Sequence, residues 1–300
     1  MQELRAWILA VVIGAVACAP AAAQSAAPHY DLTWHGSILA GAVLGSGLIV
    51  LAERNDTATC RWCGVDAQGR PSVPGIDDWG HAHLAWHNEE RATALSHLTA
   101  GASLAWPLAG LTSVHRGFGG DWKRDELVVL ESIAVAQFAS DLSKRAFLRA
   151  RPHVVFDGAA AQRLDDVHSY MSGHTATSFA AVISTATIAS RRGSRHAKWI
   201  WIGGLGLAGT TGYLRVGANR HFLTDVLTGA AVGSAVGALL PRSFDGDSDS
   251  SSVATASLLA LPIAGIGPAA RLGPHETGEV RLRFGAGARS LGVLGSINLK

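Results

Sequence analysis

Six apolar segments separated by short polar loops dominate the middle of the chain. Several approach the length of about 20 residues that a helix needs to cross a membrane. The pattern therefore predicts helices in this part of the chain, and not strands. The segments are Leu32–Ala52, Ala92–Val114, Glu126–Phe147, Thr175–Ser190, Trp199–Leu214 and Phe222–Leu240.

Small residues recur at every fourth position in three of these segments. In water, a glycine inside a helix costs about 1 kcal/mol relative to alanine, whereas in a bilayer the same spacing lets helix backbones pack closely. The spacing therefore favours an all-α, six-helix bundle of membrane type over a soluble bundle, with the polar stripe from Glu131 to Lys144 facing its interior. The three sets are Ser37, Gly41 and Gly45; Gly204, Ala208 and Gly212; and Gly229, Gly233 and Gly237.

The N-terminus resembles an export signal. Arg5 precedes the apolar run Ala6–Ala17, and Ala21–Ala23 supplies small residues for cleavage. We therefore expect a signal peptide over residues 1–23. An uncleaved membrane anchor is the alternative, because Ala6–Ala23 is almost long enough to span a bilayer.

Two other regions depart from the helical pattern. Residues 53–91 form a polar loop, and Asp245–Ser252 links the last apolar segment to a tail. In that tail Val280, Leu282 and Phe284 alternate with charged residues, which is typical of a strand. We therefore divide the chain into the signal, a helical domain at 30–242 with a core at 92–240, and a linker with a small β-like tail at 243–300.

Composition narrows the classes of partner. Hydrophobic residues make up 48% of the chain and charged residues 16%, against about 25% charged residues in ordinary soluble domains. The formal charge is only +2, and the basic residues do not form one long tract. A membrane is therefore favoured as a partner, and nucleic acid is not.

Cys60 and Cys63 form a C-x-x-C pair in the polar loop. In an oxidising compartment such a pair more often closes a disulfide than binds zinc, because zinc needs two further ligands. The nearby His81, His83 and His87 are a weaker candidate for metal binding. We therefore predict a disulfide and no metal site.

The first string with candidate chemistry is Lys144–Pro152. Lys144 and Arg151 are seven residues apart, so two helical turns would bring them to nearly the same face, where they could bind one phosphate. Pro152 should then turn the chain into a loop. Arg145 and Arg149 fall on a neighbouring face and are expected to be solvated or at lipid headgroups.

The other two strings supply histidines. Ser172-Gly173-His174 precedes an apolar run, so its backbone N–H groups and helix dipole suit an anion, and His174 can protonate a leaving oxygen. His221 and Asp225 lie four residues apart, so the carboxylate can orient the ring for attack on phosphorus. Arg215 precedes a turn that folds it back toward His221.

Together the three strings resemble the signature of the phosphatidic acid phosphatase type 2 / vanadium-dependent haloperoxidase superfamily. That signature reads K-x(6)-R-P, then P-S-G-H, then S-R-x(5)-H-x(3)-D. The first motif is complete at Lys144–Pro152, and every ionisable position of the other two is present. Met171 and Leu214 stand where the family has proline and serine. The resemblance covers about Ala92–Leu240.

The resemblance implies a phosphatase that acts on lipid phosphates without a metal or other cofactor. His221 would attack phosphorus and form a phosphohistidine, Asp225 would orient it, and His174 would protonate the leaving alcohol and then activate water. Which lipid is cleaved and the oligomeric state stay open. The phosphate-binding residues that it implies are Lys144, Arg151, Arg215, Ser172 and Gly173.

Two alternatives remain at the level of sequence. A vanadate-dependent haloperoxidase would hold vanadate as a cofactor in the same basic pocket, with His221 as its ligand. A non-catalytic membrane protein would use the pocket only to bind an anionic lipid headgroup.

The loops of the bundle differ in charge. His115–Asp125 and Arg191–Lys198 are basic and should be cytoplasmic, which places the site on the periplasmic face of a bacterial-type inner membrane. Six spans after a cleaved signal would place the site in the cytoplasm instead. The conflict is resolved if the first segment does not cross fully, if the signal is not processed as expected, or if the bundle is periplasmic and only membrane-associated.

Overall fold

The computed structural model describes residues 32–54, 56–57, 59–115, 120–158 and 161–245, and within these ranges it is helical, without β-strands. Each predicted apolar segment corresponds to one long helix, so the all-α, six-helix prediction is confirmed for this part of the chain. The predicted signal peptide and strand-like tail lie outside the described residues. The long helices are α2 (Leu32–Glu53), α4 (Glu89–His115), α5 (Gly120–Phe147), α7 (Gly173–Arg191), α8 (Ala197–Gly217) and α9 (Leu223–Leu239). The shorter ones are α3 (Gly75–Leu84), α6 (Pro152–Phe156), η1 (Leu164–Val167) and η2 (Leu240–Asp245).

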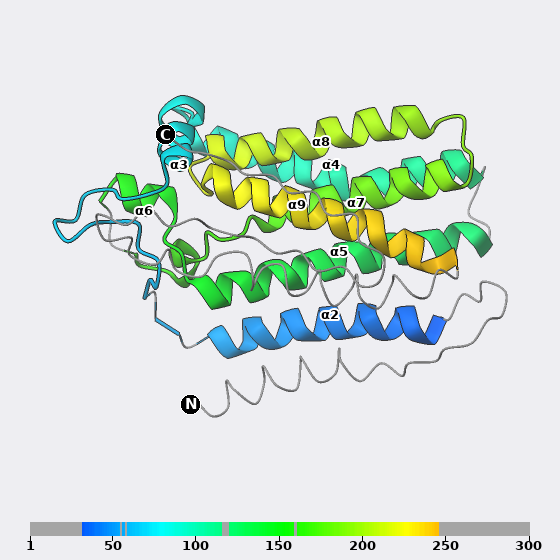
Figure 1. Ribbon diagram of the computed structural model, residues 1–300, viewed down its shortest axis with the longest axis horizontal. Coiled ribbons are helices and arrows are strands. Elements are labelled where there is room, and N and C mark those ends of the chain that lie inside the picture. The colour runs from blue at the N-terminus through cyan, green and yellow to red at the C-terminus, as the bar shows by residue number, and fades with distance from the viewer. Residues whose placement is uncertain (1–31, 55, 58, 116–119, 159–160, 246–300) are drawn as a thin grey trace, which may run out of the picture. The chain divides into compact units, whose positions relative to one another are not determined.

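Helix α7 is the central element of the bundle (Figure 1). It contacts α4, α5, α8 and α9, whereas α2 packs mainly against α5. Nearly all of α7 from Thr175 to Ala189 is buried, and most of these side chains are alanine, serine or threonine. Because such side chains are small, four neighbouring helices can approach α7 at once.

The contact between α7 and α9 depends on the glycines of α9. A Cβ at Gly233 would lie 2.2 Å from the carbonyl oxygen of Ala176, and a Cβ at Gly229 or Gly237 would lie 2.7 Å from the carbonyl oxygen of the N-cap residue Ser172 or of Ala180. No ordinary side chain fits at such distances, so these backbones pack directly against each other. The close packing predicted from this set of small residues is confirmed.

The other two sets of small residues differ from each other. On α8, a Cβ at Gly204 or Gly212 would lie 2.8 or 2.9 Å from a side chain of a neighbouring helix. On α2, Gly45 faces Phe138 of α5, but a Cβ at Gly41 would have no described neighbouring atom within 4 Å. The packing role predicted for Gly41 is therefore wrong within the described residues, because Gly41 is exposed and no described neighbour reaches this turn of α2.

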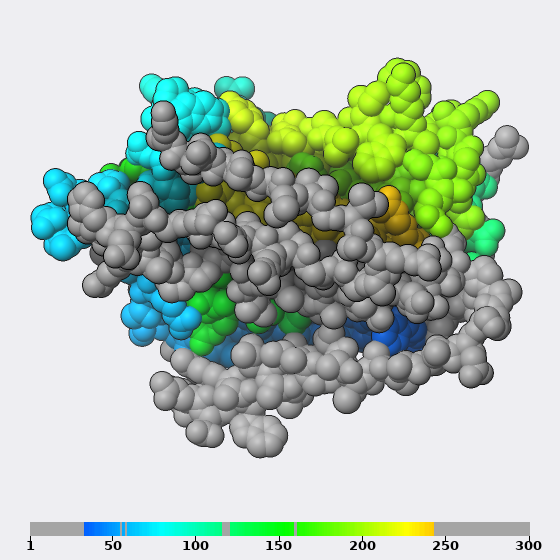
Figure 2. Space-filling model, in the orientation of Figure 1, coloured from blue at the N-terminus to red at the C-terminus, as the bar shows by residue number. Residues whose placement is uncertain are grey.

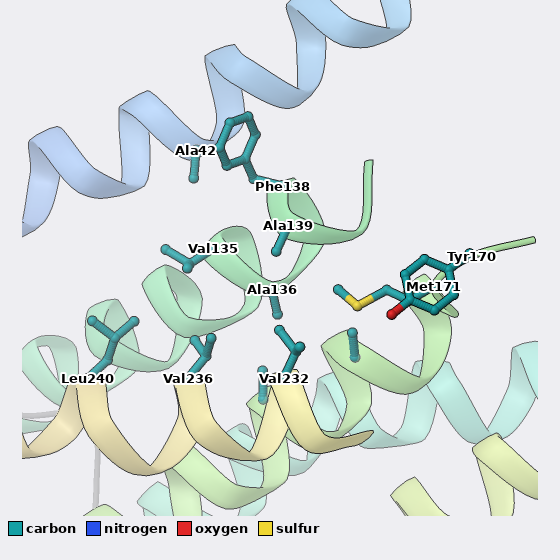
Figure 3. Close-up of a cluster of buried hydrophobic side chains, with 12 residues drawn as sticks. Ala42, Val135, Ala136, Phe138, Ala139, Tyr170, Met171, Val232, Val236 and Leu240 are labelled. Carbon is teal, nitrogen blue, oxygen red and sulfur yellow. The ribbon is translucent and has the colours of Figure 1, made fainter. Parts of the chain in front are cut away.

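An apolar cluster joins α2, α5, α9 and the chain before α7 (Figure 3). Ala42 of α2 lies beside Phe138 of α5, and Val232 of α9 packs against the same cluster. Tyr170 and Met171 extend it to the residues just before α7. The cluster therefore anchors the start of α7, where the Ser172-Gly173-His174 string lies.

The distribution of side chains differs from that in a soluble bundle, although apolar clusters are buried here too. The interior holds many buried hydroxyl groups, such as Ser132, Ser184 and Thr185, and several of them donate to carbonyl oxygens of their own helix. Large apolar side chains are exposed instead, including Leu44 at 65% and Leu98 at 68%. Two described helical stretches, Thr33–Glu53 and Leu223–Arg242, are long and apolar enough to cross a membrane.

The three strings with candidate chemistry gather at one end of the bundle. Helices α3 and α6 and the connections between α5 and α7 and between α8 and α9 lie there (Figure 1). On the face in Figure 2, the polar loop before α3, in light blue and cyan, projects at this end. The connection between α7 and α8 lies at the opposite end, where Arg192 pairs with Asp125 of α5. The fold thus separates a loop-rich end from an arginine-rich end.

Candidate active site

Helix ends and adjoining loops bring the predicted site residues together at the loop-rich end. Most lie at a helix terminus, where backbone groups are free to meet a ligand. Three cations converge on one histidine, because Arg215, Arg151 and Lys144 all act electrostatically on His221. The positions are Lys144 in the last turn of α5, Arg151 just before α6, Ser172, Gly173 and His174 at the start of α7, Arg215 in the last turn of α8, His221 between α8 and α9, and Asp225 in the first turn of α9.

The ring of His221 is buried and oriented by a backbone carbonyl. Its Nδ1 lies 2.7 Å from the carbonyl oxygen of Ser169. Since a carbonyl only accepts, Nδ1 carries the hydrogen and donates it. Burial, and then Arg215, Arg151 and Lys144, hold the pKa of His221 well below its ordinary value. The ring is therefore neutral at neutral pH, and Nε2 carries a lone pair.

Asp225 supports His221 through Ser169. Oδ2 of the carboxylate lies 3.8 Å from Nδ1 of the ring. The same Oδ2 accepts a hydrogen bond from the Ser169 hydroxyl at 2.6 Å and one from the Phe222 N–H at 3.0 Å. Asp225 thus holds the residue whose carbonyl holds the ring, and not the ring directly.

The route from Lys144 to Arg151 differs from the sequence expectation. Helix α5 ends at Phe147, and Leu148 has a φ of 44°. The two cations therefore do not share a helix face. Arg151 instead lies in extended backbone immediately before Pro152, the first residue of α6. The left-handed residue turns the chain back over the bundle, which brings Arg151 to the site by a different path.

Arg151 binds an acidic residue in this structure. Its Nε donates to the backbone carbonyl of Asp165 at 2.6 Å, and its Nη2 donates to the carboxylate Oδ1 at 2.5 Å. Burial alone would raise the pKa of Asp165, but Arg151 and other nearby charged groups outweigh it and hold that pKa below its ordinary value. Burial lowers the pKa of Arg151 itself. An anionic oxygen thus already occupies the guanidinium edge that suits phosphate.

Arg215 has unused hydrogen-bonding capacity. The residue is 4% exposed, and its Nη1 donates to the Ser96 hydroxyl at 3.2 Å. Its buried Nε has no hydrogen-bond partner among the described residues. Leaving a charged donor buried without an acceptor is costly, so the position favours an anionic ligand.

The start of α7 contributes backbone and hydroxyl groups. Ser172 occupies the N-cap position, but its hydroxyl pairs with Thr175 Oγ1 at 2.9 Å and does not cap the helix backbone. A Cβ at Gly173 would lie 3.3 Å from Lys144 Nζ, so the ammonium lies beside the first residue of α7. A phosphate oxygen there would meet both a cation and the helix dipole.

His174 has a partner that the sequence did not reveal. Its Nε2 lies 3.0 Å from Nδ1 of His97, which belongs to α4. One of these nitrogens donates and the other accepts. The two histidines are 77 residues apart, and no local pattern links them.

The expectation for Arg149 is wrong. This side chain is 1% exposed and lies between the rings of Trp62 and Phe222, at 4.0 and 3.9 Å from their centroids. It pairs with Asp77 and Asp225 and not with solvent or lipid. The reason is again the helix end at Phe147, which turns the chain inward where a continuous helix would have pointed Arg149 outward.

The polar loop packs against the chain that leads from α5 to the site. Cys60 and Cys63 are joined by a disulfide, and Trp62 between them forms a backbone bridge with Arg149. The loop histidines bond elsewhere, because His81 Nδ1 lies 3.0 Å from Asn219 Oδ1 and His83 Nδ1 lies 2.9 Å from the Trp79 carbonyl. Within the described ranges, no group of three histidine, cysteine or acidic side chains has the arrangement of a metal site.

Comparisons with known proteins find similarity over part of the chain. Residues 125–248 match the model of the PAP2 superfamily, a range that contains all eight predicted catalytic and phosphate-binding residues. The chain is 36% identical over 129 residues to a lipid A 1-phosphatase of Porphyromonas gingivalis, a match covering 41% of this chain and 26% of that protein. The chain thus spans about a quarter of the length of that relative.

A solved structure is also similar. It is the crystal structure of the first transmembrane PAP2 type phosphatidylglycerolphosphate phosphatase from Bacillus subtilis, which is 20% identical. The match covers 69% of this chain and 95% of the other, with a TM-score of 0.42.

Proposed function

Since residues 125–248 are a PAP2 superfamily segment, we propose that this protein is a metal-independent phosphatase that removes a phosphate group from a membrane lipid. The observation that carries the proposal is the environment of His221. Its ring is buried and neutral, Nδ1 donates to a carbonyl, and three cations act on it. Such a histidine has a nucleophilic lone pair in a pocket suited to an anion.

The groups that bind phosphate are cations and N–H groups that have free or exchangeable hydrogen-bond partners. Arg215 offers its unpaired Nε, and Arg151 exchanges Asp165 for a phosphate oxygen. Lys144 and the amide at Gly173 bind a further oxygen at the start of α7. Removing one such preorganised contact costs about 3 kcal/mol of transition-state stabilisation, or about two orders of magnitude in rate.

The first chemical step transfers the phosphoryl group to the protein. The Nε2 lone pair of His221 forms a bond to phosphorus, and the bond from phosphorus to the leaving oxygen breaks. That oxygen takes its electron pair and receives a proton from His174. The products are a phosphohistidine and the dephosphorylated lipid.

The second step returns the protein to its starting state. Neutral His174 accepts a proton from water, whose oxygen bonds to phosphorus while the nitrogen–phosphorus bond breaks. The electron pair returns to Nε2 of His221, inorganic phosphate leaves, and His174 is again protonated. No metal or other cofactor takes part in either step.

The surface of the bundle supports a lipid substrate. Large apolar side chains are exposed on α2, α4 and α8, such as Leu44, Leu98 and Trp199. In water these faces would be costly, whereas in a bilayer they lie in hydrocarbon. The site lies at one end of this surface, where a lipid phosphate at the membrane boundary can reach it. The name of the Porphyromonas gingivalis relative also refers to a lipid phosphate.

The arginine-rich end favours a periplasmic site. Arg124, Arg191, Arg192 and Arg195 lie at the end opposite the site, and the positive-inside rule makes that end cytoplasmic. Helix α2 has 22 residues and packs along α5, so the first apolar segment is long enough to cross the membrane fully. Its start then lies on the cytoplasmic side, at the same end of the bundle as these arginines.

The decisive experiment compares phosphate release by detergent-solubilised wild type and His221→Ala in the presence of a chelator. The panel holds phosphatidate, phosphatidylglycerophosphate, undecaprenyl pyrophosphate, lipid A and a soluble phosphomonoester. We expect chelator-resistant release from a lipid phosphate by wild type and none above background by the variant.

Three outcomes contradict the proposal. Unchanged release by His221→Ala removes the histidine mechanism. Bromide oxidation by peroxide with added vanadate indicates a haloperoxidase. Lipid binding that survives His221→Ala, with no turnover by folded wild type, indicates a non-catalytic binding protein.

A further inference from the structure

Arg149 is enclosed more completely than its charge would suggest. It is the largest fully buried side chain among the described residues. The aromatic rings of Trp62 and Phe222 lie within cation–π distance of its guanidinium carbon. The proposed chemistry gives it no role, so its burial needs another explanation.

The guanidinium joins two buried carboxylates from different parts of the chain. Nη2 donates to Asp77 Oδ2 of α3 at 2.7 Å, and Nη1 donates to Asp225 Oδ1 of α9 at 2.5 Å. Thr224 strengthens the same connection, because its N–H and its hydroxyl each donate to Asp77 at 2.8 Å. Only the planar fork of arginine can serve two carboxylates in this way, because a lysine ammonium is a single point charge.

The same network leads to the ring of His221. Asp225 accepts from the Ser169 hydroxyl, and the Ser169 carbonyl accepts from His221 Nδ1. Arg149 also binds Ser169 directly, because the Ser169 N–H donates to the Arg149 backbone carbonyl at 3.0 Å. Ser169 is therefore held on both sides by groups that Arg149 organises.

We propose that Arg149 and Asp77 are positioning residues for His221. They hold Asp225 and Ser169 in place. These two residues fix the direction of the Nδ1–H bond of His221 and therefore the direction in which Nε2 points. The inference rests on the proposed function for its catalytic consequence, but the position of the ring can be measured without turnover. The proposal also gives a role in the active site to the polar loop and α3. Both lie outside the segment that matches the family model.

The kinetic test uses Arg149→Lys and Asp77→Asn. Both keep the approximate size of the side chain. Arg149→Lys removes the fork, and Asp77→Asn removes the negative charge that one arm of the fork binds. Misplacing a reacting group by about 1 Å costs about 100-fold in rate, so we expect kcat to fall by 10- to 100-fold. KM and the inhibition constant of inorganic phosphate should stay within about twofold, because neither residue contacts the phosphate-binding groups.

Arg145→Lys is the matched control. Arg145 lies four residues earlier in the chain and pairs with Asp56 at 2.9 Å, away from Asp225. We expect this variant to keep wild-type kcat. If Arg149→Lys does not fold, Asp77→Asn alone carries the test, because it removes a charge and leaves the arginine.

A second readout is hydrogen exchange at the imidazole C2 of His221, followed by mass spectrometry of its peptide. We expect exchange to be slow in wild type and Arg145→Lys, and several-fold faster in Arg149→Lys and Asp77→Asn, with His153 as an internal reference. This measurement decides the inference even if wild type releases no phosphate, in which case only the proposed function fails.

Two results would overturn the inference. One is unchanged C2 exchange at His221 in both variants. The other is a parallel loss of kcat, phosphate inhibition and melting temperature, because a general structural defect would move all three together.

Discussion

At the scale of single residues, the contact between Arg151 and Asp165 has the most direct consequence for catalysis. The carboxylate and the backbone carbonyl of Asp165 together cover two of the guanidinium donors. The Asp165 side chain is 61% exposed, so solvent can receive it when it leaves. A phosphate must therefore compete with a protein carboxylate for the same arginine.

Asp165→Asn should strengthen phosphate binding. An exposed ion pair contributes up to about 1 kcal/mol, so removing it should lower the inhibition constant of inorganic phosphate and KM by up to about fivefold. The rate constant kcat should change little, since His221 and His174 are untouched. Inhibition and steady-state kinetics measure this, with the exposed Asp157→Asn as control. A weaker phosphate affinity would show that Asp165 helps to bind the anion.

The burial of His221 predicts a loss of stability in acid. Its pKa is well below 6.5 in the folded protein because of burial and the three cations. Below pH 6.5 His221 therefore binds a proton in the unfolded chain but not in the folded protein. The free energy of unfolding falls as the pH falls toward the folded-state pKa. The loss from this group approaches about 1.4 kcal/mol per pH unit.

Melting temperatures between pH 7 and pH 5 test this linkage. Wild type should lose stability more steeply than His221→Gln, and added phosphate should reduce the difference by neutralising the cations. Parallel pH dependence in the two proteins would mean that His221 titrates normally.

The sequence predicted the charged residues of the candidate site but not the residues that contact them in the structure. Motif spacing predicted His221, Asp225 and the three cations, because these positions lie close together along the chain or match a family signature. It did not predict that Asp77 pairs with Arg149, or that His97 pairs with His174. Those partners come from distant elements, and a single sequence contains no local signal for a contact made only by folding.

At the scale of elements, the interface between α7 and α9 determines whether the site can form. Ser172 N–H donates to the backbone carbonyl of Asp225 at 3.2 Å, so the two helix starts that carry His174 and His221 are directly joined. The glycines of α9 keep the helices at this distance. A change in the separation of α7 and α9 would therefore change the distance between His174 and His221.

Gly233→Ala should destabilise the protein, because its Cβ would lie 2.2 Å from the Ala176 carbonyl oxygen. Overpacking of this kind costs about 1–3 kcal/mol. Gly41→Ala on α2 is the matched control, since no described neighbouring atom lies within 4 Å of its added Cβ, and its effect should stay within about 1 kcal/mol. Melting temperatures in detergent compare the two. Equal effects would contradict the close α7–α9 contact.

Long elements were predicted well, and short ones were not. The six apolar segments had enough length and uniformity to identify their helices. Helices α3 and α6 have 10 and 5 residues in polar surroundings, so no apolar pattern revealed them. The end of α5 was also missed, because Leu148 adopts a left-handed conformation that its residue type does not indicate.

At the scale of the whole molecule, the bundle holds many hydroxyl groups among its buried apolar side chains and exposes large apolar side chains on its surface. This arrangement fits the proposed membrane location, with the two ends of the bundle on opposite sides. The exposed Asp157 lies at the site end and the exposed Arg195 at the arginine-rich end. Their accessibility therefore reports the orientation.

Cysteine labelling in a Cys18→Ser background tests that orientation. A membrane-impermeant maleimide should label Asp157→Cys in intact spheroplasts and Arg195→Cys only after permeabilisation. The opposite pattern would place the site in the cytoplasm, and equal labelling of both would favour a bundle that does not cross the membrane.

The hydroxyl-rich surface of α7 also has a consequence for biosynthesis. During translation this helix leaves the ribosome before α8 and α9, the partners that cover much of it. Within the membrane that we propose, α7 on its own is a poor candidate for release into lipid, whereas α2 and α9 carry the most apolar faces. We expect the insertion machinery to retain α7 until α9 has been made, so that the catalytic end is assembled only when the last helix arrives.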